Sequence, residues 1–196
     1  SPSMQDYKPR IFDYSIEAES DELNGLIASK SIQHVIDEYQ SQLTELYAIN
    51  NPSDAFSPDF KVKVTAYTSS LELAQPLKAQ GKWVYYPWNA TVVHVLDDND
   101  FQKVRTARNR ELISAEEQKE YYDAVIGVAG LSVGNSVALS VVLLGGARQI
   151  KLADHDTLDL SNLNRIRAGV EFLGLPKVVM TARQIYALNP YAEVEI

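Results

Sequence analysis

The C-terminal half of the sequence predicts an α/β fold with a parallel sheet. Three short apolar runs typical of buried strands cover residues 124–129, 149–153 and 194–196. Two runs with the apolar spacing of helices, 135–144 and 176–188, lie between them. This strand–helix–strand–helix–strand order is that of a right-handed βαβαβ unit with parallel strands.

Residues 1–104 predict a separate, small module of mixed α and β structure. Apolar side chains recur at helical spacing after Ser31, whereas Phe60, Val62 and Val64 alternate like a strand. The predicted elements are helices over 31–49 and near 70–79, and strands over 60–64, 83–86 and 91–96. An aromatic run at 83–88 is interpreted as core packing in preference to a ligand face.

Composition limits the classes of function. The formal charge of −8 argues against a general nucleic-acid binder. The chain has no cysteine, which excludes disulfides, a cysteine-ligated zinc and a cysteine nucleophile. No apolar run approaches the roughly 20 residues of a membrane span, and no signal peptide is recognised. We expect a cytoplasmic protein that does not contact membranes.

Two helical segments are expected to lead into the parallel sheet. Residues 100–110 have a helical pattern, and Ser114 with Glu117 forms the sequence signature of a capping box. The second domain is therefore expected to span residues 105–196, with the helix that Ser114 caps directly before its first strand.

A glycine-rich turn follows the first strand of this domain. Gly127, Gly130 and Gly134 are spaced differently from the usual G-x-G-x-x-G, with Ser132 between the last two. Glycines at a strand-to-helix turn allow the backbone to approach a phosphate, and the helix N-terminus offers free N–H groups. The turn predicts a Rossmann-like nucleotide site, although a plain tight turn would have the same glycines.

An acidic residue at the end of the second strand supports this interpretation. Asp154 lies 20 residues after Gly134, the distance expected for an acid that binds ribose hydroxyls. It could instead cap the next turn. His155 stands between Asp154 and Asp156, but strand alternation is expected to direct it away from both acids, so no metal site is predicted.

The segment after Asp154 carries the most specific motif. Asp154, Asp156, Ser161, Asn162 and Arg165 match the pattern D-x-D-x-x-x-x-S-N-L-x-R. This pattern resembles the ThiF/MoeB/ubiquitin-activating family, and the resemblance covers about residues 105–196. It implies ATP-dependent adenylation of a carboxylate, such as the C-terminus of a small carrier protein or peptide. Charge at the α-phosphate would require a stabiliser such as Arg165.

The resemblance also implies roles for residues outside this motif. Lys177 matches the family's phosphate-contacting lysine, and Arg110 matches an arginine that reaches the nucleotide site of a partner subunit, so a homodimer is expected. The implied catalytic residues are Arg165, Lys177 and Arg110. The implied nucleotide-binding residues are Gly130, Ser132, Gly134, Asp154, Asp156, Asn162, Arg165 and Lys177.

Other features leave alternatives open. The sequence also resembles a bacterial branch in which this domain is joined to a nitroreductase-like flavin domain. Family members continue with further strands and a magnesium-binding aspartate, so we expect a domain truncated on its C-terminal side, with the Mg²⁺ ligand in the missing part. Two alternatives stay open: an NAD-type oxidoreductase that uses the same glycine turn and Asp154, and a degenerate nucleotide-binding scaffold for a flavin partner domain, which the altered glycine spacing and the lack of cysteine allow.

Overall fold

The structure, a computed structural model, describes residues 6–196, so the first five residues of the predicted N-terminal module lie outside the described residues. The chain forms two compact units. One unit comprises residues 10–107, and the other joins residues 6–9 with residues 108–196. No helix of the described part of the chain is both long and apolar enough to cross a membrane.

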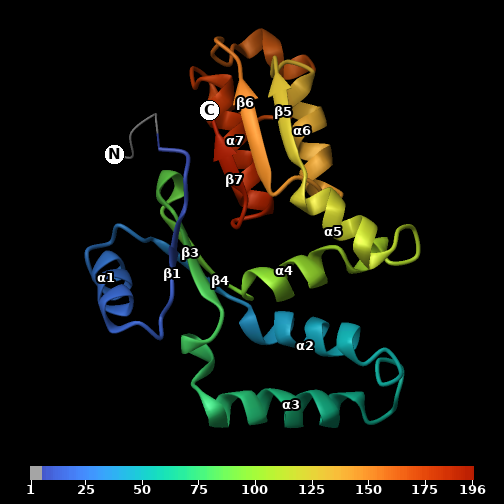
Figure 1. Cartoon of the computed structure of the whole chain (residues 1–196). Helices are drawn as coiled ribbons and strands as arrows, with labels where there is room; N and C mark the ends of the chain where they lie inside the picture. The colour runs from blue at the N-terminus through green and yellow to red at the C-terminus, as the bar shows by residue number, and fades with distance from the viewer. Residues whose placement is uncertain (1–5) are drawn as a thin grey trace. The chain divides into compact units, whose positions relative to one another are not determined.

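The unit of residues 10–107 contains a four-stranded mixed sheet in the order β1-β3-β4-β2 (Figure 1). Its strands are β1 (Arg10–Phe12), β2 (His34–Asp37), β3 (Lys82–Tyr86) and β4 (Thr91–Val95). Its α-helices are α1 (Glu17–Ala28), α2 (Tyr39–Asn50), α3 (Phe60–Ala74) and α4 (Asp98–Arg105). β2 runs parallel to β4, whereas β3 pairs antiparallel with both β1 and β4.

Two apolar clusters hold this unit together. Leu23 of α1 packs with Phe12 and with the aromatic side chains of β3, Trp83 and Tyr85. A second cluster joins Tyr39, Leu43 and Leu46 of α2 to Leu96, and helices α3 and α4 pack against it. Trp83, Tyr85 and Tyr86 are all buried, so the expectation that the aromatic run is core is confirmed for these three side chains.

Two element predictions in this unit were wrong. Residues 34–37 form β2 in place of the first part of a helix, which begins only at Tyr39. The β-branched pair Val35 and Ile36 suits a strand, and its register with β4 determines the outcome. Residues 60–64 form the start of α3 in place of a strand, because Val64, Tyr67 and Leu71 face the core at helical spacing.

The second unit contains a three-stranded parallel sheet in the order β5-β6-β7. Helix α5 (Ala115–Asp123) leads into β5 (Val125–Ala129), α6 (Gly134–Leu143), β6 (Gln149–Ala153), α7 (Lys177–Leu188) and β7 (Glu193–Glu195). Short 3-10 turns cover residues 160–164 and 170–172. The βαβαβ prediction is confirmed, and the unit has a Rossmann-like α/β fold.

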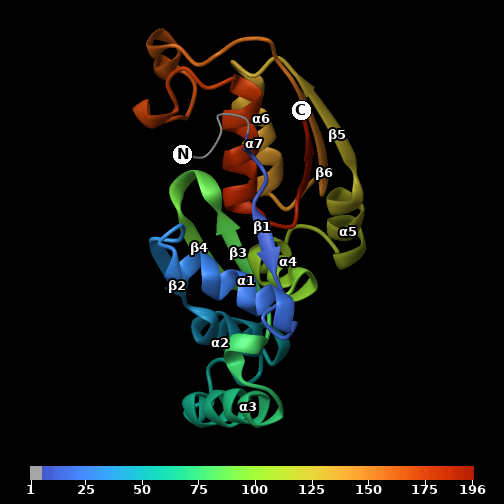
Figure 2. The ribbon, with the colours of Figure 1, turned by 90° about the vertical axis from the view of Figure 1, so that its left-hand side faces the viewer.

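Helices α6 and α7 lie on the same face of this sheet in both ribbon views (Figures 1 and 2). Alternation along the strands explains the arrangement. Ile150 and Leu152 of β6 and Val194 of β7 are buried on the face that the helices cover, and the other residues of these two strands are exposed. Helix α7 buries most of its length, including Met180 and Ile185. Because β5 and β6 are parallel and in register, their carboxyl ends lie side by side, and α6 begins a few residues after the end of β5.

The capping box at the start of α5 is present as predicted. The hydroxyl of Ser114 accepts the Glu117 N–H at 3.2 Å, and the Glu117 carboxylate accepts the Ser114 N–H at 2.8 Å. Both N–H groups belong to the first turn of the helix, where no carbonyl of the helix itself can accept them.

Replacing this cap should destabilise the unit. We expect Ser114→Ala to lower the free energy of unfolding by about 1 kcal/mol, because the Glu117 N–H loses its acceptor. Urea unfolding followed by far-UV circular dichroism measures the change. Ser140→Ala, at an exposed serine inside α6, is the matched control. A loss no larger for Ser114→Ala than for the control would contradict the capping role.

Candidate nucleotide site

The turn between β5 and α6 requires glycine at two positions. Gly130 has φ +84°, a left-handed conformation that side chains disfavour. At Gly134 an added Cβ would lie 2.8 Å from Cγ1 of Val128, so glycine permits the close approach of α6 to β5. The Gly130 N–H donates to the Ala153 carbonyl at 2.8 Å, which ties the turn to the end of β6.

The carboxylate of Asp154 joins the same two loops. One oxygen accepts the Leu131 N–H at 2.6 Å, and the other accepts the Asp156 N–H at 2.8 Å. Burial raises the pKa of Asp154, but these two hydrogen bonds and nearby positive charge outweigh it, and the pKa lies below its ordinary value. Asp154 is thus held as a carboxylate at the mouth of the glycine turn.

Lys177 brings a positive charge to this place from a distant part of the chain. Its side chain is only 4% exposed, and its Nζ lies 2.9 Å from Oδ2 of Asp156. The same Nζ lies 3.4 Å from Oγ of Ser132 in the glycine turn. Lys177 is also the first residue of α7, where the helix dipole disfavours a cation. A buried lysine at such an end is stabilised by negative groups, here Asp156.

A surface cavity of about 1230 Å³ lies over these loops. Five of the predicted binding residues line it: Gly130, Ser132, Gly134, Asp154 and Asp156. The N–H groups of Ser132 and Val133 have no hydrogen-bond acceptor within residues 6–196. Free N–H groups at a helix N-terminus, with a lysine ammonium beside them, can hold an anion such as a phosphate.

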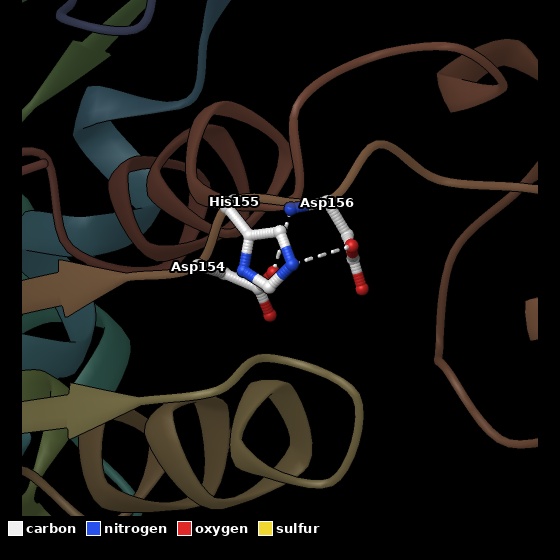
Figure 3. Close-up of side chains that lie close together, drawn as sticks. All are labelled: Asp154, His155 and Asp156. Atoms are coloured by element: carbon white, nitrogen blue, oxygen red, sulfur yellow. Dashed lines mark hydrogen bonds and ion pairs between the residues drawn. The ribbon is translucent and has the colours of Figure 1, made fainter.

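His155 lies differently from the expectation. Its Nε2 is 3.3 Å from Oδ1 of Asp156, so the prediction that His155 points away from both acids was wrong (Figure 3). Strand alternation does not apply here, because β6 ends at Ala153 and the chain turns at Asp154. One ligand atom from each of Asp154, His155 and Asp156 lies within 4.8 Å of the others, although the Asp154 oxygens already accept two N–H groups.

Four predicted residues are not part of the cavity lining: Lys177, which reaches Ser132 and Asp156 from beneath it, and Asn162, Arg165 and Arg110. Asn162 is buried, and its Oδ1 accepts the Asp159 N–H at 3.0 Å within the capping box of a 3-10 turn. Arg165 is exposed after this turn, with one guanidinium nitrogen 2.9 Å from Oδ1 of Asn164. Arg110 is exposed in the loop before α5. The structure therefore brings together the glycine turn, Asp154, Asp156 and Lys177, but not Asn162, Arg165 and Arg110.

Other lining residues were not identified from the sequence. Val133 and Val178 border the cavity, as does His155, which was considered only as a metal ligand. Val133 could have been found from its place in the glycine turn. Nothing local marks Val178, which reaches the cavity only because it follows Lys177 at the start of α7.

A parallel sheet with a phosphate-sized set of N–H groups, an acid and a lysine at its carboxyl edge defines a nucleotide-binding class of α/β domain. Residues 106–196 match the model of the ThiF family. This part of the chain is a ThiF/MoeB-like Rossmann domain.

Several known proteins are similar to this chain. The uncharacterized protein MT1398 of Mycobacterium tuberculosis (strain CDC 1551 / Oshkosh) is 38% identical over 149 residues, which are 75% of this chain and 21% of that protein. Ubiquitin-like modifier-activating enzyme 5 of Drosophila ananassae is 26% identical over 101 residues, 52% of this chain and 25% of the enzyme. The chain thus spans about a fifth to a quarter of the length of these relatives.

Among solved structures, the chain is similar to the E. coli tRNA N6-threonylcarbamoyladenosine dehydratase TcdA. The TM-score is 0.46 at 28% identity, and the match covers 52% of this chain and 41% of TcdA.

Neutralising Asp154 should weaken the unit in a pH-dependent way. We expect Asp154→Asn to lower the free energy of unfolding at pH 7 by about 1 kcal/mol, because one charged hydrogen bond to a backbone N–H is lost at a partly exposed site. The pKa of Asp154 is lower in the folded state than in the unfolded state, where it is about 4. The stabilisation that ionised Asp154 gives the fold is therefore complete above about pH 4 and is lost as the pH falls through the folded-state pKa.

The difference between the wild type and Asp154→Asn should therefore shrink below about pH 4. Urea unfolding at a series of pH values measures it. Asp123→Asn removes an exposed acid of the same unit and serves as the control. A difference that stays constant down to the lowest pH would contradict the ionised role of Asp154.

Proposed function

We propose that the domain of residues 106–196 binds ATP at the glycine turn and that the whole protein adenylates a carboxylate. The observation that carries the proposal is the position of Lys177, buried at the N-terminus of α7 and within reach of both Ser132 and Asp156. A buried cation beside unoccupied N–H donors suits a polyphosphate. The match to the ThiF family supports ATP over other nucleotides.

The proposed roles follow from these positions. The N–H groups at Ser132 and Val133 and the Lys177 ammonium hold phosphate oxygens, while Gly130 and Gly134 leave room for them. Asp154 faces the ribose with its remaining lone pairs, and Asp156 keeps Lys177 in place. Arg165 and Asn162 complete the site if the 3-10 turn moves toward bound nucleotide. ATP binds as its magnesium complex, and none of the acids within residues 6–196 is assigned to the metal.

In the proposed reaction a substrate carboxylate oxygen forms a bond to the α-phosphorus of ATP. The bond between that phosphorus and the bridging oxygen breaks, and pyrophosphate leaves, so the products are an acyl-adenylate and pyrophosphate. Negative charge grows on the phosphoryl oxygens during this step, and a preorganised arginine or lysine stabilises it. The relative named ubiquitin-like modifier-activating enzyme 5 supports the C-terminus of a small carrier protein as the substrate class.

Nucleotide choice and the role of Arg165 can be tested together. We expect ATP to bind the whole protein more tightly than NAD⁺ in calorimetry, because the site offers cations to a triphosphate. Arg165→Ala should lower ATP–pyrophosphate exchange by roughly 10²- to 10³-fold, the usual loss for a preorganised charge stabiliser. Arg167→Ala, which removes a second exposed arginine two residues further on, should change the rate by less than about threefold and is the control.

Exchange at the wild-type rate in Arg165→Ala would remove Arg165 from the mechanism. Tighter binding of NAD⁺ than of ATP would contradict the proposed function itself.

We also propose that the protein is a homodimer in which Arg110 enters the partner's nucleotide site. In that case Arg110→Ala and Arg165→Ala would each inactivate every site in their own dimers. Mixing the two variants should restore about a quarter of the wild-type exchange rate, because half of the randomly formed dimers contain one site with both arginines intact. Light scattering gives the mass, and no restored activity from a mixture that exchanges subunits would contradict the shared site.

A further inference from the structure

The unit of residues 10–107 has a cavity of its own, with a volume of about 450 Å³. Side chains from α2, α3, the start of α4 and the 75–82 segment line it. Leucines of the second apolar cluster, among them Leu43 and Leu71, make up much of its wall. Polar and charged side chains make up the rest of the wall, and a cavity of this volume can hold a small molecule.

One polar group of the wall belongs to Tyr39. The Tyr39 side chain is 6% exposed, and its ring stacks on His94 with 4.1 Å between centroids, so the ring is held in place. Its hydroxyl has no hydrogen-bond partner among the residues that the structure describes. Tyr39 lines the cavity, so its hydroxyl is available to a molecule bound there.

Charge at the cavity is unbalanced. Lys82 pairs with Asp13 at 2.8 Å and with Asp97 at 3.3 Å, so one cation faces two acids. Asp100 is a third acid in the lining, half-buried, with no ion pair within residues 6–196. An acid in the first turn of α4 is favourable for the helix dipole wherever its side chain points. The dipole alone therefore does not explain why Asp100 lines the cavity. The lining therefore carries three carboxylates and one ammonium.

The acids also act on the tyrosines. Burial raises the pKa of Tyr39 far above its ordinary value, and the negative charges of Asp97 and Asp100 raise it further. The Tyr67 hydroxyl lies in the same field, and its pKa is raised by burial and by Asp100. Both hydroxyls stay protonated at neutral pH and can accept a hydrogen bond from a cation.

We propose that this cavity binds a small organic cation, an ammonium group carried on an apolar or aromatic body. The ammonium would pair with the Asp100 carboxylate and donate to the Tyr39 hydroxyl, and the body would pack on the leucine wall. Electron-rich tyrosine rings next to acids also favour cations. An anion of the same shape would face the excess negative charge.

The probes are phenethylamine, protonated at pH 7, and 3-phenylpropionate, which has a similar body and the opposite charge. Calorimetry and ligand-observed NMR with the chain should show phenethylamine binding at least about tenfold more tightly than the acid. Asp100→Asn should weaken amine binding by about tenfold, the scale of one charged hydrogen bond. Asp98→Asn, on the same helix but outside the lining, should change it by less than about twofold.

A second pair of variants keeps the test independent of charge. Ala74 lines the cavity, and Ala74→Trp should abolish amine binding by filling it, while Leu73→Trp at the exposed neighbour should not. Circular dichroism and the thermal midpoint establish that each variant is folded. Equal binding of both probes, no amine binding at millimolar concentration, or amine binding unchanged in both Asp100→Asn and Ala74→Trp would overturn the proposal.

Discussion

The carboxylate of Asp154 holds together the two loops on which the nucleotide site depends. It accepts an N–H from the glycine turn at Leu131 and another from Asp156, so it fixes the glycine turn against the segment that follows β6. Asp156 can then pair with Lys177, because its own N–H is fixed by Asp154 and its carbonyl accepts the Lys177 N–H at 2.9 Å. The position of the lysine ammonium beside Ser132 thus follows from one carboxylate at the end of a strand.

The burial of Lys177 is the costly part of this arrangement. A charged group taken out of water is unfavourable unless it is paired, and a cation at a helix N-terminus meets the positive end of the dipole. Asp156 offsets these costs only in part, since its carboxylate is itself half-exposed. Apolar replacements of buried ion pairs are often neutral or stabilising, so stability alone does not account for a lysine here, and the proposed anion site does. The proposed phosphate would supply the further negative charge that the Lys177 ammonium lacks in the protein alone.

Local patterns were enough to predict the parallel sheet and the start of α5, because strand runs, glycines and the Ser114 cap act within a few residues. They failed at residues 34–37 and 60–64, where the apolar spacing fits both a helix and a strand. There the packing partner, β4 for the first segment and the second apolar cluster for the other, determines which of the two forms. Asp154 and Lys177 were each found by motif, but the contact of Lys177 with Ser132 joins positions 45 residues apart and could only be inferred through the family resemblance. The cavity around Tyr39 had no sequence signal, since its wall comes from several elements.

The central claim is that ATP phosphates bind at the glycine turn, and hydrogen exchange of the turn amides in the whole protein tests it most directly. The N–H groups of Ser132 and Val133 have no acceptor within residues 6–196, so they should exchange quickly without nucleotide. Saturating magnesium–ATP should slow their exchange, and the effect should be weaker in Lys177→Ala. Unchanged exchange at residues 130–134 under saturating ATP, or protection confined to the unit of residues 10–107, would contradict the account.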